Sequence, residues 1–260
     1  MMPKSGRSNQ IKPDQASAML ARCPGIFACG TVVSPQAHAA LPPPRAPASL
    51  PAMSPRALAI LLPTTAFAAP AAAPFAGLAG DKTLVVWAAP ANLDQRGGSA
   101  LTLDDGQAHF DGVVFGEIAP ARWMAGSDFH RRSRPAQDDV RAETAGPDTF
   151  VQVAVTYRGR EVSVFRNGVL LSRHEGGPPR AFGPGSAVVL GPRHLDAADG
   201  ACFAGAIDDA RIYAAALTAE QLAALRPNAP STPPPVAWWH FEDGRADDAQ
   251  GAFPPARLAR

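Results

Sequence analysis

The chain has 260 residues, of which 46% are hydrophobic and 18% charged, and its formal net charge is +1. This length and composition fit one globular domain with additional segments. The balanced charge argues against a nucleic-acid-binding surface, which requires clustered basic residues. The 28 prolines and 23 glycines indicate turns and linkers rather than a helical protein.

The N-terminal segment is predicted to lie outside the folded domain. Residues 1–52 are rich in Pro, Ala and Ser without periodicity, so we expect them to be disordered or untranslated. From Met53, a basic residue, a short apolar run and an A-x-A site ending at Ala68 have the pattern of a secretory signal peptide. The apolar run is too short to span a bilayer. We therefore predict that Met53 is the true start, that residues 53–75 are a signal peptide and short linker, and that the protein is secreted or periplasmic. An Ala/Pro-rich low-complexity tail is the alternative.

The chain after this leader has the pattern of successive short strands. Strands are expected at residues 82–87, 99–103, 110–117 and 122–127. Glycine and proline turn signals separate them. Short strands at regular spacing with almost no helix indicate a β-sandwich.

The clearest local signals follow residue 150. Residues 151–157 alternate Val or Tyr with smaller or polar side chains, which is the period of a half-buried strand. Asn167-Gly168 suits a type I′ hairpin turn, because both central positions need positive φ. A further strand is expected at residues 203–213. Thr218 and Gln221 then form a capping box for a helix over residues 219–225.

The C-terminal part begins with a proline-rich linker at residues 227–235. Residues 236–260 either begin a truncated second module or fold back as an edge strand. Trp238, Trp239 and Phe241 are too apolar to remain exposed, which favours fold-back or contact with a partner.

Several of these segments together resemble the laminin-G-like, concanavalin-A-like jelly-roll modules. The resemblance implies an all-β, two-sheet antiparallel jelly-roll sandwich over residues 76–226 with one short C-terminal helix. The matching residues are Val153 to Tyr157, Phe165 to Leu170, Leu190-Gly191, Phe203 to Tyr213 and Ala216-Leu217-Thr218.

A longer resemblance concerns function. Residues 84–117 and 238–244 are similar to the accessory jelly-roll region that precedes the catalytic domain of exported invertase-like glycoside hydrolases. This resemblance implies an exported, non-catalytic module that binds a glycan or a cell-surface ligand. Two alternatives stay open: an N-terminal fragment of such a hydrolase with its catalytic domain beyond Arg260, and a structural protein-interaction spacer.

No catalytic motif is found in the chain. Glycoside hydrolysis requires two carboxylates about 5 to 10 Å apart. Asp111 and Glu117 share one face of a predicted strand but would lie some 20 Å apart at the strand rise. The W-M-N-D-P-N-G motif of the invertase-like nucleophile is also absent.

A sugar site requires an exposed aromatic side chain with polar groups beside it, and four residues are the candidates. Trp123 is the aromatic candidate, although aromatic residues on sandwich strands usually belong to the core; Phe129, Tyr157 and Tyr213 are the other aromatic residues considered. Asp128 and Arg131 lie in the long polar segment 128–148, which is either functional or a solvated insertion. His194 lies near Asp196 and Asp199 in a loop that matches no established ligand pattern.

Asp208 and Asp209 are the candidate calcium ligands. Simple alternation places Asp208 on the same strand face as Ala210 and Ile212, so an inward face would bury its carboxylate and require a partner. The resemblance implies a calcium ion near this strand, and hard cations prefer carboxylate and carbonyl oxygens. Hydrogen bonding to the backbone or to an arginine is the alternative. Cys202 is expected to be simply buried, without a disulfide.

Overall fold

The computed structural model describes most of the chain from Phe75 onward, and the backbone of Thr31–Val32. The predicted signal peptide lies outside the described residues, as do Asp196, Asp199 and the side chain of Asp128. The described ranges are 75–107, 109–183, 185–195, 202–241 and 246–258.

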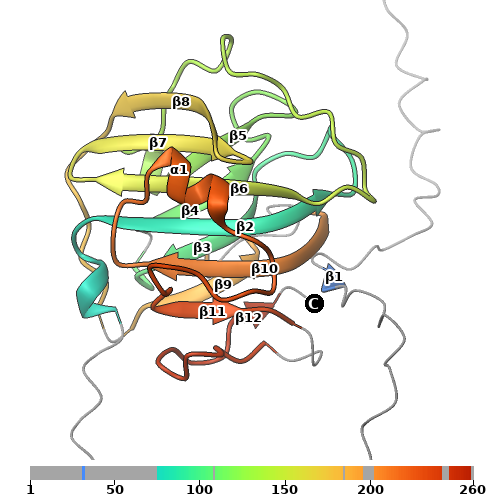
Figure 1. The fold of residues 1–260 in the computed structure, drawn as a ribbon. Helices are drawn as coiled ribbons and strands as arrows, with labels where there is room; N and C mark the ends of the chain where they lie inside the picture. Colours follow the sequence, from blue (N-terminus) through green and yellow to red (C-terminus); the bar gives the residue numbers. More distant parts are fainter. Residues whose placement is uncertain are drawn as a thin grey trace, which may run out of the picture.

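The described residues form two stacked β-sheets (Figure 1). The seven-stranded sheet has the order β1-β10-β2-β6-β7-β8, with β11 also paired to β10, and the five-stranded sheet has the order β12-β9-β3-β4-β5. All neighbouring strands are antiparallel except the β1/β10 and β12/β9 pairs. The predicted two-sheet antiparallel sandwich with one short helix is confirmed. The elements are β1 (Thr31–Val32), η1 (Ala76–Leu78), β2 (Lys82–Pro90), β3 (Gly98–Asp104), β4 (Phe110–Phe115), β5 (Trp123–Ser127), η2 (Asp128–His130), β6 (Val151–Arg158), β7 (Glu161–Arg166), β8 (Val169–Glu175), β9 (Ala187–Gly191), β10 (Gly205–Tyr213), α1 (Ala219–Ala224), β11 (Ala237–Trp239) and β12 (Arg257–Leu258).

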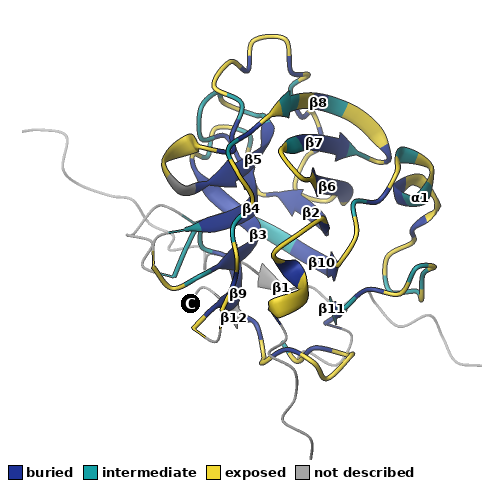
Figure 2. Ribbon diagram, turned by 90° about the vertical axis from the view of Figure 1, so that its left-hand side faces the viewer, coloured by how far each residue is buried: buried dark blue, intermediate teal, exposed yellow. Residues whose placement is uncertain are grey.

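The core lies between the sheets because alternate residues of each strand point inward. Val153 and Val155 of β6 belong to the same buried cluster as Val113 and Phe115 of β4. Figure 2 shows both sheets buried along most of their strands, whereas β8 at one edge carries exposed residues. The apolar alternation read from the sequence therefore marks the core.

Helix α1 covers part of the outer face of the seven-stranded sheet (Figure 1). The predicted capping box is present, since Thr218 Oγ1 accepts from the Gln221 amide and Gln221 Oε1 accepts from the Thr218 amide. The Asn167-Gly168 turn also has positive φ at both residues, as predicted, and a Cβ at Gly168 would lie 2.7 Å from the Ala223 Cβ. A glycine is thus required there both by conformation and by the approach of the helix.

The segment after β5 packs on the domain instead of forming a solvated insertion. Arg132, Val140 and Glu143 within it are buried. Glu143 holds the C-terminal part of this segment against the sheets. Its carboxylate accepts from the Trp123 indole N–H at 2.9 Å and from two nitrogens of Arg166 at 2.8 Å. Burial alone would raise the pKa of Glu143, but these donors and two backbone amides lower it to about 2.

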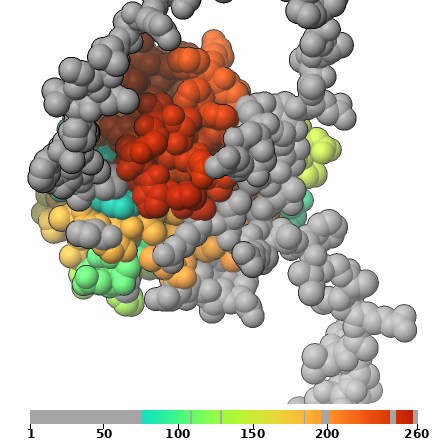
Figure 3. Space-filling model, turned by 90° about the horizontal axis from the view of Figure 1, so that it is seen from below, coloured from blue at the N-terminus to red at the C-terminus, as the bar shows by residue number. Residues whose placement is uncertain are grey.

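The C-terminal segment completes the sandwich. Strand β11 pairs with β10, as in the fold-back alternative, although β10 separates it from Lys82 of β2. The fully buried Trp239 packs edge-on against Phe253, whose ring lies 5.0 Å from that of Phe75. Figure 3 shows the terminal residues gathered over this end of the molecule. They belong to the same core as the two sheets.

We expect Glu143→Gln to lower the free energy of unfolding in a pH-dependent way. A carboxyl group with a pKa of 4.5 when unfolded and about 2 when folded stabilises the fold by roughly 3 kcal/mol at neutral pH. Because the folded pKa is the lower one, this stabilisation is complete above the unfolded pKa and is lost as the pH falls toward 2. Urea unfolding from neutral to acidic pH should therefore show a shrinking difference between the two proteins. The control Glu161→Gln removes a half-exposed carboxylate 3.8 Å from Arg173 and should change stability by less than about 0.5 kcal/mol. A difference that does not vary with pH would contradict the role given to Glu143.

Trp239→Ala should destabilise the whole sandwich, because it leaves a cavity between β11 and the core. Truncation of a large buried aromatic residue costs about 3–5 kcal/mol. The exposed Val169 provides the control, and Val169→Ala should change the unfolding free energy by less than about 0.5 kcal/mol. Denaturant unfolding measures both. Equal stability of the Trp239 variant and the wild type would show that the C-terminal segment is not part of the cooperative fold.

Candidate functional site

A groove of about 360 Å³ opens on the outer side of the five-stranded sheet, beside β4 and the end of β5, where the chain enters η2. Val113 and Phe115 of β4 point into the core, whereas Phe110 and Val114 form a separate small cluster on the opposite face. The groove is therefore a surface feature, and its volume is typical of a small-ligand site. It is lined by Phe110, Glu117, Ser127, Phe129, His130, Arg193 and His194.

Phe110 and His194 contribute two neighbouring rings to the groove. Their ring centroids are 6.0 Å apart, and only 7% of Phe110 is exposed. A Cβ at Gly126 of the neighbouring β5 would lie 2.8 Å from the Phe110 ring and 2.4 Å from Val114. The glycine therefore lets the Phe110 ring lie close against the sheet.

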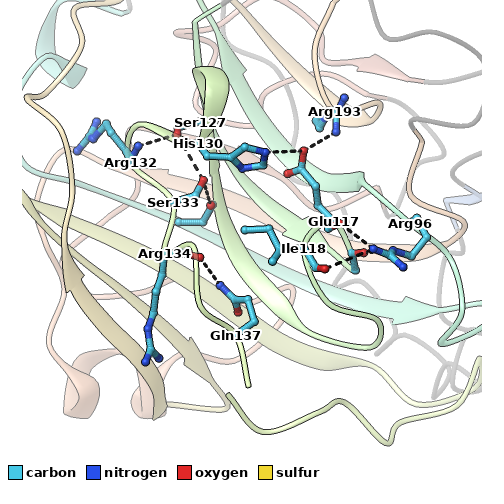
Figure 4. Close-up of polar contacts among 12 residues, drawn as sticks. Arg96, Glu117, Ile118, Ser127, His130, Arg132, Ser133, Arg134, Gln137 and Arg193 are labelled. Atoms are coloured by element: carbon cyan, nitrogen blue, oxygen red, sulfur yellow. Dashed lines mark hydrogen bonds and ion pairs between the residues drawn. The ribbon is translucent and has the colours of Figure 1, made fainter. Parts of the chain in front are cut away.

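Charged and titratable side chains also line the groove (Figure 4). Glu117 Oε1 pairs with Arg193 Nη1 at 2.5 Å, and His130 Nε2 lies 3.9 Å from the same oxygen. Arg96 donates to the backbone carbonyls of Gly116 and Glu117, which holds this turn in place. Both of these groups approach Oε1, so the other carboxylate oxygen, Oε2, is left as a further acceptor.

Phe129 stands at the rim as an exposed aromatic side chain. Its exposed fraction is 83%, the largest among the exposed large hydrophobic residues of the described chain. Phe129 and His130 both have left-handed backbones, with φ of 47° and 60°. For residues other than glycine this conformation costs on the order of 1–3 kcal/mol each, and such strain tends to cluster at functional sites.

The structure brings one of the four predicted ligand-binding residues into the groove and excludes another. His194 lines it. Arg131 is exposed beside it, with its carbonyl bonded to the Gly177 amide, and Asp128 belongs to η2 at the groove. Trp123 as a sugar platform is wrong: it is 1% exposed and packs against Phe115 with the rings tilted by 55° and their centroids 4.6 Å apart. Alternation along β5 turns its side chain into the core.

Sequence reasoning missed Glu117, His130 and Arg193 as members of one site. They come from three separate segments, and no spacing in the chain connects them. Phe129 was recognised only as one aromatic residue among several. Its position within a polar segment was the available signal, because an apolar ring there has no strand pattern to bury it.

The expected calcium ligands lie on the other sheet, and a β-bulge changes their orientation. Ile207 pairs with Ala88 and Asp209 with Trp87, so Asp208 is an extra residue in β10. Ile207 therefore lies in the core with Ala210 and Ile212. The prediction from simple alternation, which placed Asp208 on that face of the strand, is wrong.

Asp209 is fully buried and surrounded by donors. Its carboxylate accepts two bonds from Arg211 at 2.8 and 2.7 Å, one from the Asn228 amide at 2.7 Å and one from the Trp238 indole at 3.0 Å. Asp208 accepts from the Asn228 side chain at 3.3 Å. In the described part of the chain, no group of three or more His, Cys, Asp or Glu residues is placed to hold a metal. Calcium binding stays an untested prediction.

Comparisons with known proteins place this architecture. Residues 64–223 match the family model of the concanavalin A-like lectin/glucanases superfamily. No curated protein matches the sequence. In the described residues, no helix is long and apolar enough to cross a membrane.

Solved structures of similar fold include three from bacteria. Domain 4 of AbnA, a GH43 extracellular arabinanase from Geobacillus stearothermophilus, in complex with arabinotriose, is 22% identical over 56% of this chain and 68% of that chain, with a TM-score of 0.43. A putative carbohydrate-binding protein from Bacteroides ovatus is 14% identical over 67% of this chain and 50% of that chain, with a TM-score of 0.49. The CBM40 of the Ruminococcus gnavus IT-sialidase, bound to α2,6 sialyllactose, is 15% identical over 56% and 82%, with a TM-score of 0.41. Since the matched family region covers more than half of the sequence and the sheets have the expected arrangement, the chain belongs to the concanavalin A-like lectin/glucanase superfamily.

Proposed function

We propose that this chain is an exported, non-catalytic carbohydrate-binding module, accessory to a glycoside hydrolase, and that the groove beside Phe129 holds the sugar. The observation that carries the proposal is the exposed Phe129 ring, held in a left-handed backbone next to the Glu117–Arg193 pair. Membership of a family of lectins and glucanases supports the same class of ligand.

The chemistry of the groove fits a neutral sugar. One face of a pyranose or furanose ring carries C–H groups and packs on an aromatic ring, whereas its hydroxyls need donors and acceptors. Phe129 supplies the apolar surface. The Oε2 atom of Glu117 accepts from one hydroxyl, and the remaining N–H groups of Arg193 donate to its neighbour. A carboxylate and a guanidinium held together in this way match two adjacent hydroxyls.

The carboxylates do not support hydrolysis at this site. Among the side chains that the structure describes, Glu117 is the only carboxylate that lines the groove. Asp111 of β4, the other acidic residue considered in the sequence, lies inside the sandwich and pairs with Lys82 and Arg132. Hydrolysis requires two carboxylates across one glycosidic bond, so binding is the function that the geometry favours.

Phe129→Ala should abolish most of the glycan binding. A central aromatic contact contributes on the order of 2 kcal/mol or more to binding, so the affinity should fall at least about 30-fold. A glycan array probed with the full chain identifies the bound sugar, and calorimetry with that sugar measures the loss. Phe150→Ala, which removes another exposed phenylalanine, is the matched control and should bind as the wild type does. Binding unaffected by Phe129→Ala would exclude this groove, and a well-folded chain that binds no glycan would favour a structural spacer.

Export is tested separately. When the gene is expressed in a bacterium with a secretory pathway, the mature protein should begin after Ala68, at Ala69. N-terminal sequencing of the exported protein measures this. A mature terminus upstream of Met53 would contradict the signal peptide.

A further inference from the structure

We propose that Arg132 is a positioning residue, and that its ion pair with Asp111 inside the sandwich holds Phe129 ready for the sugar before any sugar arrives. This inference rests on the function proposed above. Arg132 lies just beyond the strained pair Phe129 and His130 and is only 1% exposed. Its Nη1 donates to Asp111 Oδ1 and Oδ2 at 3.1 and 2.9 Å, and its guanidinium lies 4.4 Å from the centre of the Tyr157 ring.

The backbone around Arg132 is fixed from several sides. Its amide donates to Ser127 Oγ at 2.8 Å, at the end of β5 (Figure 4). Its carbonyl accepts from His174 Nε2 of β8 at 2.9 Å. The next residue, Ser133, donates its hydroxyl to the Ala125 carbonyl at 2.8 Å. The chain from Ser127 to Arg132 is thus closed into a short loop with both ends tied to the sheets.

This closure explains how the strained conformation is maintained. Left-handed residues other than glycine persist only where their surroundings over-determine them. Phe129 has no packing of its own to hold it, because its side chain is in solvent. The constraint must therefore come from the rest of the loop, where the Arg131 carbonyl also accepts from the Gly177 amide at 2.8 Å. The buried Arg132 side chain is the largest group anchored there. We call the left-handed conformation that exposes the Phe129 ring the platform conformation. Without the Arg132 side chain, we expect the sugar-free protein to populate this conformation less.

The charges of the cluster indicate that fold stability is not the main role of Arg132. Lys82 Nζ also lies 2.9 Å from Asp111 Oδ2, and both side chains are fully buried. Two cations therefore surround one carboxylate, and Lys82 alone is enough to neutralise it. Among the described residues, Arg132 Nε and Nη2 have no hydrogen-bond partner. A buried ion pair of this kind is weak evidence for stability, and fixing one geometry is the alternative role.

The test is Arg132→Met in the full chain. The substitution keeps an unbranched apolar stem over Tyr157 and leaves the balanced Lys82–Asp111 pair in place. The melting temperature should change by only a few degrees. The conformation of Phe129 is followed by ¹⁹F NMR of protein labelled with 4-fluorophenylalanine, in which Phe129→Ala identifies the Phe129 resonance. Without any sugar present, the wild type should show one dominant Phe129 resonance, whereas Arg132→Met should show the resonances of an exchanging mixture of conformations.

Sugar affinity should fall by the same factor as the population of the platform state, because the apparent dissociation constant scales inversely with that population. We expect a loss of roughly tenfold for a strain of this size. Titration with cellotriose, maltotriose, xylotriose, arabinotriose and kestose provides the affinities. Arg132→Lys, which keeps the charge but not the two-oxygen contact, should be intermediate. Arg134→Met, which removes a surface pair with Asp139 from the same segment, is the matched control and should change neither the spectrum nor the affinity.

The outcomes separate the two proposals. An unchanged Phe129 resonance, or an unchanged affinity where the wild type binds, would overturn the positioning role. If no sugar binds to the wild type while the Phe129 resonance still changes in Arg132→Met, the proposed function is wrong, but the inference that Arg132 holds the conformation of Phe129 is supported. If Arg132→Met does not fold, Arg132→Lys decides the question. The positioning role is overturned if Arg132→Lys is as stable as the wild type and neither its spectrum nor its sugar affinity is altered.

Discussion

One buried carboxylate joins the main parts of this structure. Asp111 belongs to the five-stranded sheet, Lys82 to the seven-stranded sheet, and Arg132 to the segment that leads away from β5. A charge inside a sandwich is tolerated only when it is paired, because the interior solvates it poorly. Burial lowers the pKa of Lys82, and the ion pair with Asp111 opposes that shift. The need to pair Asp111 therefore links both layers and the segment that carries the candidate site.

This arrangement holds both ends of the segment after β5 and leaves the stretch around Phe129 exposed. Arg132 anchors the segment near its start, and Glu143 anchors it near its end through Trp123 and Arg166. Between β5 and the first anchor only a short stretch projects, and it carries the Phe129 ring into solvent. Binding surfaces gain affinity when their contact groups are held in place beforehand, because less freedom is lost on association. The polar interior and the proposed function are connected in this way.

A second buried carboxylate organises the opposite face. Asp209 pairs with Arg211, whose guanidinium lies between the rings of Trp87 and Trp238 at 5.1 and 4.7 Å. Trp238 comes from the C-terminal segment, so this stack ties β11 to β2 and β10. Desolvated cation–π contacts of this kind stabilise by up to about 2 kcal/mol. Within the chain, Arg211 is therefore the cation that pairs with the buried Asp209 carboxylate.

The sequence alone determined the features that depend on near neighbours in the chain. The alternation in β6, the Asn167-Gly168 turn and the Thr218 capping box follow from local stereochemistry and from which side chains can be buried, so they were predicted correctly. Only the tertiary structure decided the bulge at Asp208, the burial of Trp123 and the assembly of Glu117, His130 and Arg193. Each of these depends on strand register or on loops that meet across the sheet. The free energy that selects such contacts comes from groups far apart in the chain, and therefore no local pattern records it.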